Sequence, residues 1–228
     1  MTESDSMNQI SSLYLVTPVI EAPSSMADAL EEACSAADIS AVMIRLAAAD
    51  DRTQINRIKI LAPIVQKHGA AAIIAVPDSE DADIAALAAR GGADGIHVPY
   101  DPETLRDLLD RLKGERSLGV GGLRTKDEAM RSGEIGVDYV MFGEPRADGF
   151  VPQRDAITER AQWWAEIFET PCVAFAETLA DVRPMAETGA EFIALENVVW
   201  AHDKGPGEAV RQAGKILAEV AALRAEQQ

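Results

Sequence analysis

The sequence predicts an α/β fold, the (β/α)8 or TIM barrel, from one repeated phrase and from the strands that alternate with it. A small residue, an acid and a short apolar run recur four times, starting at Ala37, Gly92, Gly136 and Gly189. The copies lie about 50 residues apart, roughly twice the length of one strand-plus-helix unit. We therefore expect a second set of strands between the copies, and four further apolar runs supply it.

These two sets give eight strands. In each copy of the phrase, the small residue indicates the end of a helix, the acid a turn, and the apolar run a buried strand. The predicted strands cover, in chain order, residues 13–16, 39–44, 71–76, 95–98, 116–120, 139–142, 172–175 and 192–195.

Amphipathic helices with recognisable start signals are predicted between the strands. A Ser or Thr followed three residues later by an acid is typical of a helix start, and proline is favoured in the first turn. Eight such units, joined by right-handed crossovers, close into a barrel. An open doubly wound sheet is the alternative, but no glycine-rich phosphate fingerprint follows the first strand. The start signals are Ser25 with Asp28, Thr125 with Glu128, Thr178 with Asp181, Pro102 and Pro206.

Composition fits a single barrel domain over residues 1–228, with a polar segment at 1–10 that we expect to be flexible. At 47% hydrophobic residues, the chain can bury a substantial core. Its 38 acidic residues against 21 Lys and Arg give a formal charge of −17, which disfavours nucleic acid and anionic membranes as partners. Neither a signal peptide nor a membrane span is recognisable, so we expect a cytoplasmic protein.

In a barrel of this kind, function resides at the carboxyl ends of the strands and in the loops that follow. We therefore expect a small-molecule ligand at this face. The residues predicted there are rich in carboxylates and poor in lysine: Thr17, Arg45, Asp78, Tyr100, Asp101, Gly121, Gly122, Arg124, Glu144, Arg146, Asp148, Glu177, Glu196, Asn197 and Trp200.

Four motifs together resemble the thiamine phosphate synthase family, in the family's order. They are LYLVT from Leu13, GADGIHV from Gly92, GVG from Gly119 and DYVMFG from Asp138. The resemblance implies a (β/α)8 barrel, often a homodimer, that joins hydroxymethylpyrimidine diphosphate to thiazole phosphate and releases pyrophosphate with the help of Mg2+. Such a reaction needs cations around the departing diphosphate, because negative charge builds up on it.

The resemblance assigns candidate residues in the first half of the chain. Of the family's Gln-x-Arg-x-Lys pattern on strand two, Arg45 is retained, whereas Met43 and Ala47 replace the other two. The Asn-Asp pair after strand three is absent. Asp78 and Asp101 are the nearest candidates for Mg2+ ligands.

The second half departs further from the family. Gly121, followed by Gly122, stands in place of the strand-five serine, and Arg146 lies in the segment that replaces the Thr-x-Thr-Lys diphosphate loop. Glu177 and Glu196 stand where the family's thiazole phosphate rests on N–H groups. Two carboxylates there should repel a phosphate.

Arg45 shares a strand face with Met43 and should point into the barrel. An unpaired guanidinium there is costly, so we expect a carboxylate partner, Glu196 or Glu177, or an anionic ligand.

The other candidates have structural interpretations beside the functional ones. Asp78 and Asp101 each precede a helix and can cap it, and the Gly121-Gly122 pair can form a turn with positive φ or present N–H groups to an anion. His97 can pack in the core or act as a base, and Trp200 can pack at the barrel mouth or stack on a flat ring.

Three functions remain open from the sequence. The first is a thiamine phosphate synthase with an altered site. The second is a related thiazole tautomerase, although Leu123 and Arg124 occupy the region of that family's histidine. The third is a small-molecule binding barrel whose acidic mouth suits a neutral or cationic ligand. Under each of these hypotheses, the residues at the family's phosphate site are replaced in this chain.

Overall fold

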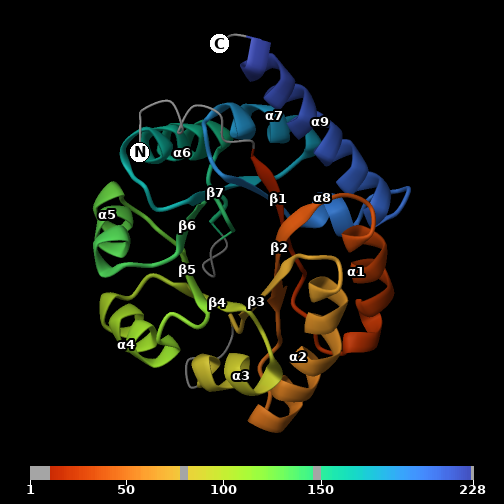
Figure 1. The fold of residues 1–228 in the computed structure, drawn as a ribbon, viewed down its shortest axis with the longest axis vertical. Coiled ribbons are helices and arrows are strands. Elements are labelled where there is room, and N and C mark those ends of the chain that lie inside the picture. Colours follow the sequence, from red (N-terminus) through yellow and green to blue (C-terminus); the bar gives the residue numbers. More distant parts are fainter. Residues whose placement is uncertain (1–10, 78–81, 146–149, 227–228) are drawn as a thin grey trace.

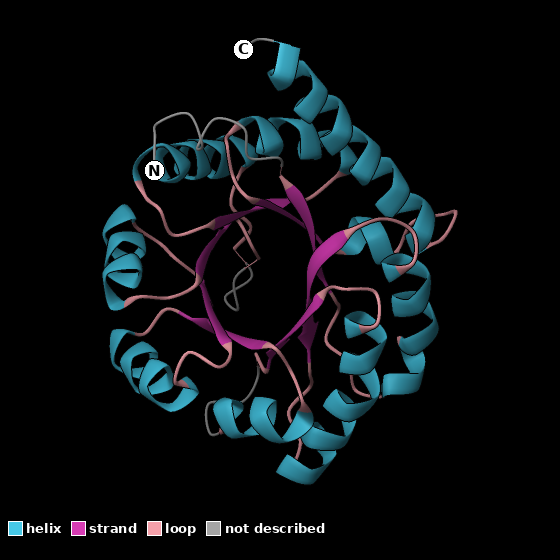
Figure 2. Cartoon of the chain, viewed as in Figure 1, coloured by secondary structure: helices cyan, strands magenta, loops and turns pink. Residues whose placement is uncertain are grey.

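The computed structural model describes residues 11–77, 82–145 and 150–226 and has a closed barrel of eight parallel strands in chain order. The strands form an inner ring, and the helices surround it (Figures 1 and 2). β1 pairs with β8 and so closes the ring, which confirms the predicted fold. The strands are β1 (Ser12–Val16), β2 (Ile39–Arg45), β3 (Ala71–Ala75), β4 (Gly95–Pro99), β5 (Ser117–Gly121), β6 (Tyr139–Phe142), β7 (Cys172–Ala176) and β8 (Phe192–Leu195).

Helices follow the strands, and most begin where the sequence predicts. Capping boxes start α5 at Thr125 and α7 at Thr178, and α4 and α9 begin at their prolines. None of the described helices is long and apolar enough to cross a membrane. The helices are α1 (Ala27–Cys34), α2 (Asp51–Gln66), α3 (Ile84–Gly91), α4 (Pro102–Leu112), α5 (Lys126–Ile135), α6 (Arg154–Ile167), α7 (Leu179–Glu187), α8 (Asn197–Trp200) and α9 (Pro206–Glu226).

The predicted helix start at Ser25 is wrong. Pro23 opens a separate 3-10 turn, η2 (Pro23–Ser25), in which the Ser25 hydroxyl donates to the carbonyl of Ala22 at 2.7 Å. Ser25 therefore lies inside this turn, and Met26 occupies the N-cap position of the helix. α1 therefore begins at Ala27, after Met26, without a side-chain cap.

Alternation along the strands divides the core into two layers. On β2, Val42 and Ile44 belong to the apolar layer beneath the helices, whereas Ala41 and Met43 belong to a smaller cluster that fills the barrel lumen. Successive strand residues point to opposite faces, so Arg45 continues the lumen face of β2. The lumen is thus packed at its centre and becomes polar toward the carboxyl ends of the strands.

Three of the four acids of the repeated phrase act at the opposite end of the barrel. Asp94 accepts a hydrogen bond from the backbone N–H of Ala72 at 2.8 Å, and Asp138 accepts one from Leu118 at 2.7 Å. Glu191 does the same for Cys172 at 2.8 Å. Each of these three acids precedes one strand and accepts a hydrogen bond from a backbone N–H of the strand before it, so it links neighbouring strands.

Candidate functional site

Arg45 lies at the carboxyl end of β2 and is held by residues that directly follow β1 and β8. Its Nη2 forms an ion pair with Glu196 Oε1, and its Nε donates to the carbonyl oxygen of Thr17 at 2.5 Å. The Thr17 hydroxyl in turn accepts the backbone N–H of Arg45 at 3.0 Å. The predicted ion pair is confirmed, with Glu196 rather than Glu177 as the partner.

Glu196 and Trp200 complete this side of the mouth. Glu196 follows β8 and is only 8% exposed, because its carboxylate turns inward to Arg45 instead of capping α8. The indole N–H of Trp200, one turn further on, donates to the carbonyl oxygen of Val16 at 2.6 Å. Trp200 also packs against the outer core, as the structural interpretation of this residue expects.

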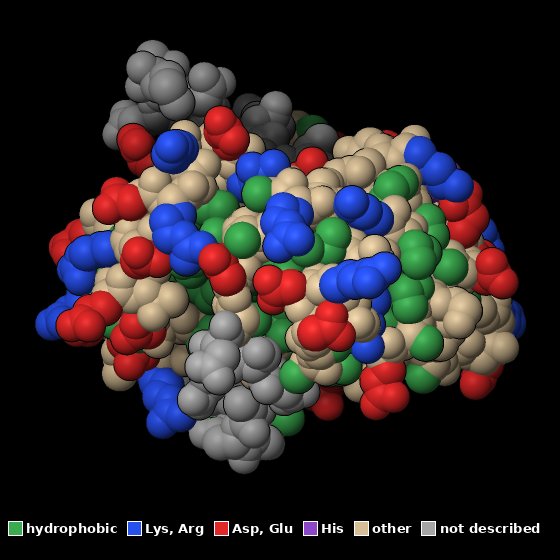
Figure 3. Space-filling model, turned by 90° about the horizontal axis from the view of Figure 1, so that it is seen from below, with side chains coloured by type: hydrophobic (Ala, Val, Ile, Leu, Met, Phe, Trp, Pro, Cys, Tyr) green, Lys and Arg blue, Asp and Glu red, His purple; other side chains and the backbone are tan. Residues whose placement is uncertain are grey.

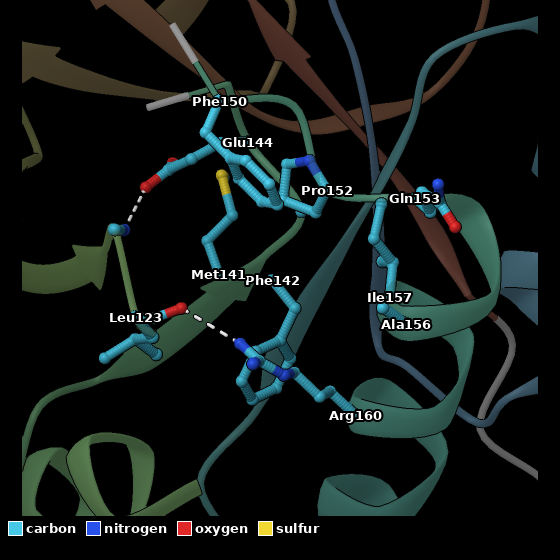
Figure 4. Close-up of a pocket in the computed structure, with 12 residues that line it drawn as sticks. Leu123, Met141, Phe142, Glu144, Phe150, Pro152, Gln153, Ala156, Ile157 and Arg160 are labelled. Carbon is cyan, nitrogen blue, oxygen red and sulfur yellow. Dashed lines mark hydrogen bonds between the residues drawn. The ribbon is translucent and has the colours of Figure 1, made fainter. Parts of the chain in front are cut away.

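A second carboxylate, Glu144, follows β6 and reaches across to β5. Its Oε1 accepts the backbone N–H of Gly122 (Figure 4). Its Oε2 lies 3.2 Å from Nε2 of His97. Gly122 has a φ of +67°, the turn conformation that favours glycine. A Cβ at Gly121 would lie 1.7 Å from Oε1 of Glu144, so this position must lack a side chain for the carboxylate to fit.

His97 belongs to a buried hydrogen-bonded chain in the lumen. Its Nδ1 lies 3.0 Å from the hydroxyl of Tyr139, which lies 2.8 Å from the hydroxyl of Tyr14. Burial raises the pKa of both tyrosines above the ordinary value of 10.0, so both are neutral hydroxyls near pH 7. A Cβ at Gly119 would lie 2.0 Å from Tyr139 Cζ, so this glycine makes room for the ring.

This chain of contacts between Tyr14 and Glu144 is not among the sequence-based expectations. The signal was present, since Tyr14, His97 and Tyr139 each alternate with aliphatic residues that face the helices. His97 is 7% exposed, in agreement with a packed histidine. Its Nε2 is nevertheless a buried nitrogen without a partner in hydrogen-bond geometry in the described part of the chain.

A pocket of about 270 Å³ opens beside Glu144, between the loop after β5 and the start of α6 (Figure 4). Its walls are mainly apolar, with Leu123, Phe142 and Ile157 among them. Arg160 borders it and donates to the carbonyl oxygens of Leu123 at 3.0 Å and Arg124 at 2.6 Å. The pocket therefore combines apolar walls with one carboxylate at its rim.

The remaining predicted site residues do not join these two clusters. Asp101 caps α4, where hydrogen bonds from the hydroxyl and the N–H of Thr104 lower the pKa of its carboxyl group. Glu177 is exposed at the end of β7. Asp78 and Arg146 lie outside the described residues. Within residues 11–77, 82–145 and 150–226, no three His, Cys, Asp or Glu side chains are grouped so that they could hold a metal ion.

Comparison with known proteins agrees with this architecture. The family model described as thiamine monophosphate synthase matches residues 13–199. The thiamine-phosphate synthase of Rhodospirillum centenum is 34% identical over 207 residues, which cover 90% of this chain and 97% of that protein. The corresponding protein of Hyphomonas neptunium is 30% identical over 227 residues, which cover 97% and 100%.

A solved structure gives the same fold. The thiamine phosphate pyrophosphorylase of Pyrococcus furiosus superposes with a TM-score of 0.73 at 19% identity, over 94% of this chain and 98% of that one. The match of the family model and the coverage of the two relatives extend over nearly the whole barrel. The chain belongs to the thiamine monophosphate synthase family.

Proposed function

We propose that this barrel binds a small molecule at its carboxyl-end mouth and forms thiamine phosphate slowly or not at all. The ion pair of Arg45 with Glu196 carries the proposal. The family reaction expels a diphosphate, and the charge that develops on it needs cations and N–H donors. Arg45 is the cation retained from the family's strand-two pattern, and a carboxylate of the same chain already binds it.

The mouth is also unfavourable for the second phosphorylated substrate. Glu196 and Glu177 follow β8 and β7, where the resemblance places the thiazole phosphate. At 4 Å, two like unit charges repel by about 1 kcal/mol in bulk water and by about 4 kcal/mol near a protein surface. The apolar walls beside Glu144 are better suited to a neutral or cationic ring.

The family resemblance implies Mg2+ as a cofactor. Proteins commonly hold this ion with one or two carboxylates together with substrate phosphates. Asp101 offers one exposed carboxylate, but one of its oxygens already caps α4. The described residues therefore do not form a resident Mg2+ site, and a phosphorylated ligand would have to supply the missing oxygens.

We further propose a cytoplasmic homodimer that binds neither nucleic acid nor membranes. The homodimer is what the resemblance implies. The formal charge of −17 supports the exclusion of polyanionic partners, because such partners are bound chiefly through Lys and Arg.

The test is a turnover and binding assay on the purified protein. With hydroxymethylpyrimidine diphosphate, thiazole phosphate and Mg2+, we expect little or no thiamine phosphate by chromatography. Thermal shift should respond to unphosphorylated thiamine, a cation, more than to thiazole phosphate or inorganic phosphate, each with and without Mg2+. Turnover near the ordinary enzyme range of about 1 per second would overturn the proposal.

A further inference from the structure

Glu144 occupies groups that otherwise suit a ligand anion. A backbone N–H in a turn with positive φ binds anions readily, and Gly122 directs such an N–H at Glu144 Oε1. The other carboxylate oxygen lies 3.2 Å from Nε2 of His97. The side chain of Glu144 thus stands where two donors converge.

The neighbouring strand is shaped for this carboxylate. Any side chain at Gly121 would collide with Glu144, since a Cβ there would lie 1.7 Å from Oε1. By the family resemblance this position carries a serine. The glycine and the carboxylate therefore form a matched pair in this chain: the first makes the space, and the second fills it.

His97 is the observation that points to a ligand. Its ring is fixed by a hydrogen bond between Nδ1 and the hydroxyl of Tyr139 and stacks on that residue, with centroids 5.7 Å apart. When the tyrosine hydroxyl is the donor in this bond, the neutral ring carries its hydrogen on Nε2. Nε2 lies 3.2 Å from Oε2 of Glu144, but this contact lacks hydrogen-bond geometry. A buried polar atom left in this state is costly, and a better-placed acceptor would relieve the cost.

The carboxylate also has room to leave. The side chain of Glu144 is 20% exposed and borders the 270 Å³ pocket. In Figure 4 it points from the pocket rim toward the backbone of β5. Rotation of this side chain into the pocket would uncover both donors without movement of the strands.

We propose that the N–H of Gly122 and Nε2 of His97 form an oxyanion-binding position that the chain fills with its own Glu144. A ligand that carries a small oxyanion, such as a phosphate group, must displace this carboxylate to bind there. The inference rests on the small-molecule site proposed above and adds to it the group that excludes anions.

The test compares phosphate binding by Glu144→Ala with that by Glu103→Ala. Glu103 is an exposed acid in the first turn of α4, so its replacement removes the same charge without touching the donors. Inorganic phosphate is titrated by calorimetry and by NMR of the Gly122 amide. We expect Glu144→Ala to bind phosphate about tenfold or more tightly than the unmodified protein, which is the scale of one hydrogen bond to a charged group. Glu103→Ala should bind like the unmodified protein.

Equal gains in the two variants would mean general relief of charge and would overturn the proposal. An unchanged affinity in Glu144→Ala, or a Gly122 amide that does not shift with phosphate, would overturn it too. Gly121→Ala provides an independent variant, because its methyl group should expel the carboxylate while keeping the charge. Its Gly122 amide should shift before any phosphate is added, and an unshifted resonance would contradict the matched pair. These readouts do not involve turnover, so they are separate from the test of synthase activity.

Discussion

Toward the carboxyl ends of the strands, two large polar side chains in the lumen each lie against a glycine of the neighbouring strand. Tyr139 lies over Gly119, and Glu144 lies over Gly121, with no space for a Cβ at either glycine. Substitutions on one strand therefore decide which side chains the next strand can turn inward. This coupling explains how the carboxylate of Glu144 reaches the N–H of Gly122 and how the ring of Tyr139 fits beside β5.

Removal of Glu196 tests whether Arg45 is held by its internal partner. Glu196→Ala leaves a largely buried guanidinium with the Thr17 carbonyl alone, and we expect a loss of about 1 to 3 kcal/mol in the free energy of unfolding. Urea denaturation measures it. Glu177→Ala removes an exposed carboxylate from the same mouth and should change stability by less than about 0.5 kcal/mol. Equal losses of stability in the two variants would contradict a stabilising ion pair between Arg45 and Glu196.

The buried tyrosines predict a stability loss in alkali. Tyr14 and Tyr139 have pKa values raised by burial, so the unfolded chain releases their protons from about pH 10 upward while the folded chain retains them. Stability is therefore fully present below pH 10 and falls as the pH rises above it. Tyr139→Phe should make this fall shallower between pH 9.5 and about 11, in urea titrations at each pH.

The same variant should also lower the free energy of unfolding at neutral pH, and Tyr100→Phe is its control. Tyr139→Phe removes the hydroxyl shared by Tyr14 and His97 and should cost about 1 to 3 kcal/mol. Tyr100→Phe alters a partly buried tyrosine outside this hydrogen-bonded chain and should cost less at neutral pH. Equal losses in the two variants, or an alkaline slope in Tyr139→Phe equal to that of the unmodified protein, would refute the contribution of Tyr139.

Among the elements, the repeated phrase proved more informative than single start signals. It marks four of the eight strands directly, and its spacing of about two strand-plus-helix units indicates the other four between the copies. The prediction at Ser25 is wrong because Pro23 provides a competing turn next to it. The predicted fifth strand stops one residue short of Gly121, because a glycine carries little strand signal although the barrel pairs it with Pro99.

The repeated acids should matter for stability at the end of the barrel away from the mouth. Asp138→Ala leaves the N–H of Leu118 without its carboxylate acceptor, and we expect a loss of about 1 to 2 kcal/mol by chemical denaturation. Asp110→Ala changes an exposed acid on α4 and should stay within about 0.5 kcal/mol of the unmodified protein. Comparable losses in both variants would assign the effect to charge rather than to the strand contact.

Across the whole molecule, the site was harder to predict than the fold. The ion pair of Arg45 follows from strand alternation and from the cost of an unpaired buried charge. The contact of Glu144 with Gly122 and His97 does not, because it joins three strands and depends on the missing side chain at Gly121. Such contacts need the barrel's register, which periodicity alone does not supply.

The net charge of −17 does not make every face acidic. On the face in Figure 3, Lys and Arg side chains alternate with acidic ones and with apolar patches. Exposed pairs such as Arg131 with Asp127 and Arg183 with Glu219 are of this mixed kind. Surface pairs contribute about 0 to 1 kcal/mol each, so the excess acids leave a long-range repulsion that these pairs do not cancel.

That repulsion predicts how salt changes the melting temperature. At pH 7, raising NaCl from about 50 to 500 mM shortens the screening length from more than 10 Å to less than 8 Å, and we expect the melting temperature to rise as repulsion among distant carboxylates weakens. The control is the same titration near pH 5, closer to the sequence pI of about 4.5, where the net charge is smaller and the rise should shrink. A melting temperature that falls with salt at pH 7 would mean that screened ion pairs outweigh the relieved repulsion, so local attraction rather than net charge would govern the stability of the barrel.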